Sequence, residues 1–153
     1  MDFTNKINIS NKKAFFNYEI LDKYIAGIRL QGTEIKSIRL GKASLVDSFC
    51  EFEGHELFVK NLNISEYVLG THYNHAPRRT RKLLLERTEL IKLKRAAVQK
   101  GLTIIPLRLF ISEKGFAKLE IALAKGKKEF DKRDTIKDRD WQRDRSRIMK
   151  KNH

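Results

Sequence analysis

Apolar residues along this chain fall into short runs of the length of β-strands. Residues 14–30 are rich in β-branched and aromatic side chains, and Tyr18, Ile20 and Tyr24 share one parity with the apolar residues that follow. This alternation is typical of one face of an extended strand. Gly27 lies inside the run and indicates a bend or β-bulge. The pattern therefore predicts one long, bent strand.

Two further pairs of apolar runs predict β-hairpins. Residues 45–52 and 57–62 form the first pair, and residues 102–111 and 116–124 form the second. A short polar turn that contains glycine separates the two runs of each pair, as expected for hairpins. Antiparallel pairing of consecutive strands is therefore the expected organisation.

Two segments carry helix signals between these strands. Thr33 as N-cap and Gly41 just past the last turn bound a short predicted helix. A longer helix is predicted over residues 83–100, where apolar residues recur three and four positions apart and Gly101 follows as a C-cap. About six strands with two or three helices predict a mainly β protein, in which an antiparallel sheet closes into a barrel with accessory helices.

The composition divides the chain into three parts. Residues 1–13 are polar and predict a flexible N-terminal arm, whereas residues 14–124 contain the strands and can form the barrel. Residues 125–153 contain 12 Lys or Arg, 6 acids and few large apolar side chains. A segment that buries so little is expected to be disordered alone, and to fold as a basic helical tail only on a partner.

The net charge of +14, from 33 Lys or Arg and 19 Asp or Glu, points to a polyanionic partner such as RNA. The lone Cys50 excludes an internal disulfide, and together with the lack of an N-terminal apolar segment it favours a cytoplasmic protein. No apolar run is long enough to span a membrane.

The densest cationic cluster contains Arg78, Arg79, Arg81 and Lys82, directly before the longer predicted helix. Cations at a helix N-terminus oppose the helix dipole, so this cluster favours a bound phosphate group. A second group lies on and just after the short helix and would support the same contact: Lys36, Arg39 and Lys42.

Catalytic chemistry is poorly represented in the sequence. His72 and His75 are three residues apart, but no third ligand lies near them, which disfavours a metal site. No nucleophile motif or nucleotide-binding glycine loop is present, and no cofactor is expected. Two alternatives to a specific RNA-binding factor remain: a general ribosome-associated barrel protein, and a metal-dependent RNA-processing enzyme that uses the two histidines.

A set of ordered motifs resembles the tmRNA-binding family known as small protein B or SsrA-binding protein. The matching stretches run from near the N-terminus into the tail: Asn11-Lys12-Lys13-Ala14, Gly32-Thr33-Glu34-Ile35-Lys36-Ser37, Asn74-His75, Arg81-Lys82-Leu83-Leu84-Leu85, Ala124-Lys125-Gly126-Lys127-Lys128 and Asp131-Lys132-Arg133. The resemblance implies an oligonucleotide-binding (OB) barrel. It also implies a non-enzymatic factor that binds the tRNA-like domain of tmRNA and delivers it to stalled ribosomes for trans-translation, together with elongation factor Tu.

The resemblance and the charge pattern together predict two groups of contact residues. The expected tmRNA contacts are Asn11, Lys12, Lys13, Lys36, Arg39, Lys42, Arg78, Arg79, Arg81, Lys82 and Leu84. The tail is expected to probe the decoding centre and the empty mRNA channel through Lys127, Lys128, Phe130, Asp131, Lys132, Arg133, Lys137, Arg139, Trp141, Arg143, Arg145 and Arg147. Ile25 and Glu86 depart from the family pattern, in which a Glu and a His or Asn are expected.

Overall fold

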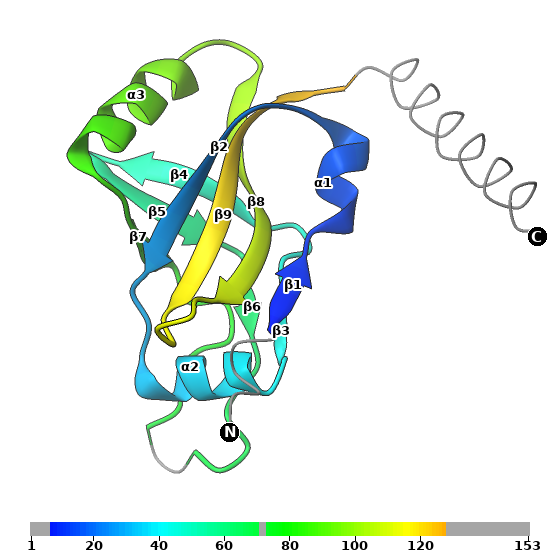
Figure 1. The fold of residues 1–153 in the computed structure, drawn as a ribbon, viewed down its shortest axis with the longest axis vertical. Coiled ribbons are helices and arrows are strands. Elements are labelled where there is room, and N and C mark those ends of the chain that lie inside the picture. The colour runs from blue at the N-terminus through cyan, green and yellow to red at the C-terminus, as the bar shows by residue number, and fades with distance from the viewer. Residues whose placement is uncertain (1–6, 71–72, 128–153) are drawn as a thin grey trace, which may run out of the picture.

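A closed ring of antiparallel strands forms the body of the protein. The computed structural model describes residues 7–70 and 73–127. The ring runs in the order β8-β4-β5-β7-β2-β9, and β9 pairs back onto β8 (Figure 1). Its strands are β2 (Tyr18–Ile28), β4 (Phe49–Glu53), β5 (Glu56–Lys60), β7 (Arg81–Leu84), β8 (Leu102–Ile111) and β9 (Ala117–Gly126). The predicted six-stranded barrel is confirmed, and so are both hairpins.

Smaller elements surround the barrel. β1 (Asn8–Ser10) pairs with the free edge of β8, and β3 (Ala43–Ser44) pairs with β6 (Asn63–Ile64) in a separate ribbon. The helices are α1 (Lys12–Asn17), α2 (Gly32–Arg39) and α3 (Arg87–Ala97). α2 and α3 lie toward opposite ends of the barrel, and α1 lies beside β8 (Figure 1). None of the described helices is long and apolar enough to cross a membrane.

The prediction of a flexible N-terminal arm over residues 1–13 is wrong for residues 8–13, which are ordered in β1 and the start of α1. Residues 8–10 form β1, whose three residues pair with β8 from Arg108 to Phe110. α1 follows at once, so the extended strand begins at Tyr18 and not at Ala14. Ala14 is buried against β8 and β9, and this packing overrides the strand preference of the neighbouring aromatic residues.

The bulge in β2 lies at Leu21 and not at Gly27. The pairing of β2 with β9 shifts between Ile20 and Asp22, so one extra residue reverses the faces of the strand. Ile20 therefore packs outside the barrel near α1, while Tyr24 packs against the inner core. The shared parity of these residues predicted one common face, which the bulge divides in two.

Apolar side chains from all six ring strands fill the barrel. The core joins residues of the strands to Ile38 of α2 and Leu93 of α3, both without exposed surface. A smaller cluster lies on the outer side of the sheet, where Ala14 covers Ile105, Ala122 and neighbouring residues. α1 thus covers one part of the outer sheet surface and leaves the rest open.

Both helices differ in extent from their predictions. Gln31 and not Thr33 is the N-cap of α2. Gly41 follows the C-terminus of α2 as predicted, and its φ is positive, at 74°. The long helix predicted over residues 83–100 begins only at Arg87, because Arg81–Leu84 is recruited as strand β7 between β5 and β2. Tertiary pairing overrides the high helix propensity of leucine there.

Candidate RNA-binding surface

Strand geometry divides the basic cluster before α3 between two faces of the sheet. Successive residues of a strand point to opposite sides, so Arg81 and Leu83 face the barrel interior while Lys82 and Leu84 face outward. Arg81 has no exposed surface. Its prediction as an RNA contact is therefore wrong, because its guanidinium cannot reach a phosphate from inside the fold. The assumed helix start with four exposed cations does not exist.

Arg81 instead forms a buried ion pair with Glu34 of α2. Its Nε donates a hydrogen bond to Oε2 of Glu34, and both side chains are fully buried. The remaining guanidinium nitrogens donate to the carbonyl oxygens of Leu62 at 2.6 Å and Pro77 at 3.0 Å. Since every nitrogen of the guanidinium has a partner, this arginine joins α2, β7 and two loops.

Arg79 completes this network from its edge. Its Nη2 donates to Oε1 of Glu34 at 2.6 Å and to the carbonyl oxygen of Arg29 at 3.3 Å. The backbone N–H of Gln31 also donates to Oε1 at 2.8 Å. Burial alone would raise the pKa of Glu34, but the bonds from Arg79, Gln31 and Arg81 outweigh it and hold the pKa below its usual value.

The depressed pKa of Glu34 predicts a loss of stability in acid. Its contribution is complete above the usual glutamate pKa of 4.5 and is lost as the pH falls through the lower folded-state value. Urea unfolding between pH 7 and pH 3 measures this effect. The stability advantage of the unsubstituted protein over a Glu34→Gln variant should stay constant down to about pH 4.5 and narrow below it. An advantage independent of pH over this whole range contradicts the assignment.

His75 is a buried structural residue. Its Nε2 lies 2.8 Å from the carbonyl oxygen of Ile64 and therefore donates, while Nδ1 forms a hydrogen bond of 2.9 Å with the Thr33 hydroxyl. Both ring nitrogens are thus engaged within the protein. Residues 7–70 and 73–127 contain no group of three or more metal-ligating side chains, and His72 lies outside these ranges.

Asn74 shapes the loop before His75. Its side chain accepts from the backbone N–H of Tyr67 at 3.2 Å and donates to the Tyr67 carbonyl at 2.9 Å. A Cβ on Gly70 would lie 2.6 Å from the Asn74 amide nitrogen, so a larger residue there would displace the amide that bonds to Tyr67. The motif residues Thr33, Glu34, Asn74 and His75 therefore build the fold, and sequence inspection did not assign them this role.

Five of the remaining predicted cations lie on the surface in two groups. Lys12 and Lys13 are exposed on α1, while Lys36, Arg39 and Lys42 are exposed on or just after α2. Arg78 is exposed in the loop before β7. Lys82 faces outward, and its Nζ donates to Glu56 at 2.8 Å. Asn11 is more enclosed, since its side chain donates to the Pro106 carbonyl at 3.0 Å and fixes the start of α1.

An open sheet face connects the two groups. Paired residues of neighbouring strands point to the same side of a sheet, so Leu84, Gly27, Lys118, Phe110 and Asn8 form one outward row across five strands. The outer surface near this row is not covered by α1. Leu84 is half exposed at one end of the row, and β1 leads directly into α1 at the other.

A groove of about 380 Å³ lies at the Leu84 end of this face. Arg39 of α2, Leu84, Lys118 and the exposed Phe116 line it, together with Gly27. A Cβ on Gly27 would lie 3.3 Å from the Cβ of Leu84, so glycine allows β2 and β7 to stay close and leaves room above the sheet. The structure thus brings Arg39 and Leu84 together in a mixed apolar and cationic site, as RNA binding requires.

Comparison with known proteins assigns the chain to a family. The profile of the SmpB protein family matches residues 8–151, nearly the whole chain. This chain belongs to the SmpB family. It is 63% identical over 146 residues to the SsrA-binding protein of Christiangramia forsetii, covering 95% of this chain and 93% of that relative. It is 64% identical over 144 residues to the SsrA-binding protein of Flavobacterium psychrophilum, covering 94% and 96%.

A solved SmpB structure has the same fold. It was described under the words "tmRNA-SmpB: a journey to the center of the bacterial ribosome", and its chain is 47% identical to this one. The TM-score is 0.69, with coverage of 80% of this chain and 86% of that chain. In this chain, the open sheet face and the buried Glu34 network are thus built on the fold of an SmpB protein.

The two positions expected to depart from the family pattern, Ile25 and Glu86, have clear places in this structure. Ile25 lies on the outward face of β2, is 47% exposed and pairs with Glu120. Glu86 is the N-cap of α3, where its backbone N–H donates to Glu89 at 3.3 Å and a negative charge suits the helix dipole. Glu86 therefore serves α3, while Ile25 adds apolar surface to the open face.

The structure describes only residues 125–127 of the predicted tail. Lys125 and Gly126 end strand β9 and pair with β2, so the strand runs two residues past the boundary predicted at Lys125. The backbone N–H of Lys127 donates to the Asn17 carbonyl at 2.9 Å, and its Nζ donates to the Phe15 carbonyl at 3.1 Å. Lys127 thus fixes the end of β9 against α1. The other predicted ribosome contacts lie outside the described residues, from Lys128 and Phe130 to Arg147.

Proposed function

We propose that this protein binds the tRNA-like domain of tmRNA and delivers it to stalled ribosomes for trans-translation. The observation that carries the proposal is the open sheet face of an SmpB-family barrel, with exposed cations on α1 at one side and on α2 at the other. Such a surface suits a folded RNA, whose backbone contacts the cations while unpaired bases contact apolar and planar side chains.

The body and the tail have different roles in this proposal. The barrel selects the RNA, and residues 128–153 enter the decoding centre and the empty mRNA channel. Phe130 stacks on a base there, and the later cations contact ribosomal RNA. Elongation factor Tu accompanies the complex through its own contact with aminoacylated tmRNA. The protein acts in the cytoplasm as a binding factor, and the RNA and ribosome carry out the chemistry.

RNA binding through phosphate contacts should depend steeply on salt. If about six to eight phosphates are neutralised, a plot of log K against log salt concentration should have a slope on the order of −4 to −7. Fluorescence anisotropy with labelled tmRNA between about 50 and 300 mM potassium chloride measures this slope. A matched tRNA serves as the competitor. A nearly flat response would argue against backbone recognition.

A further inference from the structure

The outer face of β8 carries a planar stack that the predicted tmRNA contacts do not include. The guanidinium carbon of Arg108 lies 4.1 Å from the centre of the Phe110 ring. These residues are two apart on one strand, so both side chains point outward. A guanidinium this close to a ring centre stacks on the aromatic face.

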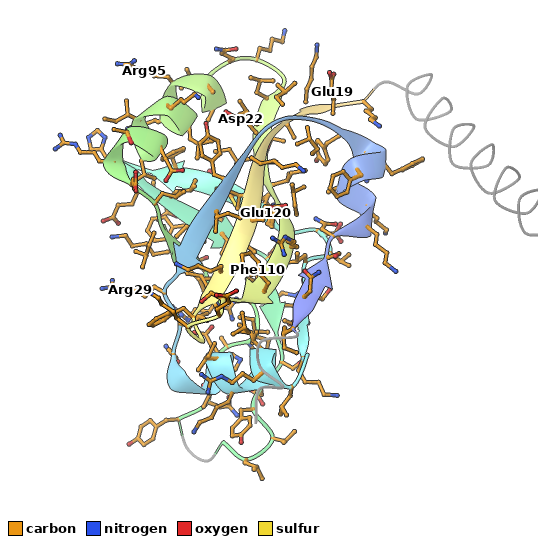
Figure 2. The ribbon with its side chains drawn as sticks, in the orientation of Figure 1. Glu19, Asp22, Arg29, Arg95, Phe110 and Glu120 are labelled. Carbon is orange, nitrogen blue, oxygen red and sulfur yellow. The ribbon has the colours of Figure 1, made fainter. Side chains whose placement is uncertain are left out.

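Glu120 on β9 holds this stack in place. Arg108 pairs directly with Glu120 across the strands, and their Nε and Oε2 atoms are 3.5 Å apart. The Arg108 side chain remains 37% exposed, whereas that of Glu120 is only 18% exposed. Figure 2 shows Phe110 and Glu120 over the β8 and β9 ribbons, on the sheet face turned to the viewer. One side of the guanidinium rests on the ring, and surface remains accessible for a ligand.

This stack continues the candidate RNA-binding surface. Phe110 stands in the same cross-strand row as Lys118, Gly27 and Leu84, and Arg108 stands in the next row beside Glu120 and Ile25. Glycine at position 27 contributes no side chain between the groove and Lys118, so a bound strand can pass over it. The stack is therefore accessible to an RNA already held at Leu84 and Arg39.

The charges in this region distinguish a base from a phosphate as the ligand. Glu120 offsets the charge of Arg108, so the stack offers a flat surface with little net positive charge. Lys118 stands beside it, and among the described residues no acidic side chain forms an ion pair with it. A neutral base suits the guanidinium plane, and the adjoining phosphate suits Lys118.

We infer that Arg108 and Phe110 form a stacking site for one unpaired base of the bound RNA, with Lys118 contacting its phosphate. This inference deepens the proposed function and rests on it. Arg108 and Phe110 add affinity through base contact and do not add phosphate neutralisation. Glu120 is a positioning residue, because it acts by holding Arg108 over the ring.

The test compares tmRNA binding by full-length variants. Arg108→Lys keeps the charge but removes the guanidinium plane, and Phe110→Leu keeps an apolar side chain but removes the ring. Each should raise the dissociation constant for tmRNA by roughly 5- to 100-fold, which corresponds to the loss of one stacked base. Lys118→Gln should instead reduce the magnitude of the salt slope by about one. Thermal unfolding confirms that each variant folds.

Arg95→Lys is the matched control, because Arg95 is exposed on α3, away from the β8–β9 face (Figure 2). It should bind tmRNA as the unsubstituted protein does. The stacking site is refuted if folded Arg108→Lys and Phe110→Leu bind as tightly as this control. If Phe110→Leu does not fold, the affinity of Arg108→Lys for tmRNA alone decides whether the stacking site exists.

A different result would refute the proposed function. If the unsubstituted protein shows no preference for tmRNA over tRNA, that function is wrong. The same variants, measured on the RNA that is bound, still decide whether a base stacks on Arg108.

Discussion

Replacing Glu34 with Gln should lower the free energy of unfolding by about 3–5 kcal/mol at neutral pH. Glu34 is fully buried and accepts hydrogen bonds from Arg79, Arg81 and the Gln31 backbone. Glutamine has no negative charge, so the guanidinium of Arg81 would remain buried without its counterion. Chemical denaturation monitored by circular dichroism measures the loss.

Glu56→Gln is the matched control for this substitution. Glu56 also accepts from a cation, Lys82 at 2.8 Å, but its side chain is 55% exposed and water can replace the contact. Its removal should change stability far less than the removal of Glu34, because exposed ion pairs contribute little. Equal effects of the two substitutions would show that the buried network does not stabilise the barrel.

A chain that ends at Lys127 should bind tmRNA as the full chain does, yet fail to support tagging on stalled ribosomes. The barrel, the open face and the Lys127 contacts to α1 all remain in this variant. The lost residues carry the cations and aromatic side chains proposed to contact ribosomal RNA. Binding by anisotropy and tagging in a reconstituted translation reaction measure the two activities.

Thermal unfolding of the shortened chain controls for damage to the barrel. If tmRNA binding and tagging fall together in a folded protein, the separation of roles between body and tail is wrong. If tagging persists without the tail, the proposed probing of the mRNA channel is wrong.

Local alternation predicted most of the barrel. The hairpins around Gly54 and Gly115 are visible in sequence because apolar runs flank a turn, and both glycines adopt positive φ. Pairing between strands that are distant in sequence is not encoded locally. β7 was therefore predicted as the start of a helix, since Leu83, Leu84 and Leu85 suit either structure until β5 and β2 pair with that segment.

The same limit explains the errors in the predicted site. Charge alone suggested that Arg78, Arg79, Arg81 and Lys82 act together, but strand alternation turns Arg81 inward to meet Glu34. Arg81 and Leu83 are two residues apart and therefore share one face of a strand. This spacing was the available signal that Arg81 points inward with the buried Leu83. The motifs indicated the family, which the family profile confirms over residues 8–151, but they did not separate residues that build the fold from those that face solvent.

The most direct test of the central claim is to isolate the protein from cells and sequence the RNA bound to it. Full-length protein, tagged and purified after dissociation of ribosomes, should retain tmRNA as the dominant RNA, far above its share of total cellular RNA. Double substitution of Arg39 and Leu84 in the groove by Ala should reduce this enrichment in a protein that still folds. Recovery of tRNA and ribosomal RNA in proportion to their abundance, without enrichment of tmRNA, would contradict the proposed function.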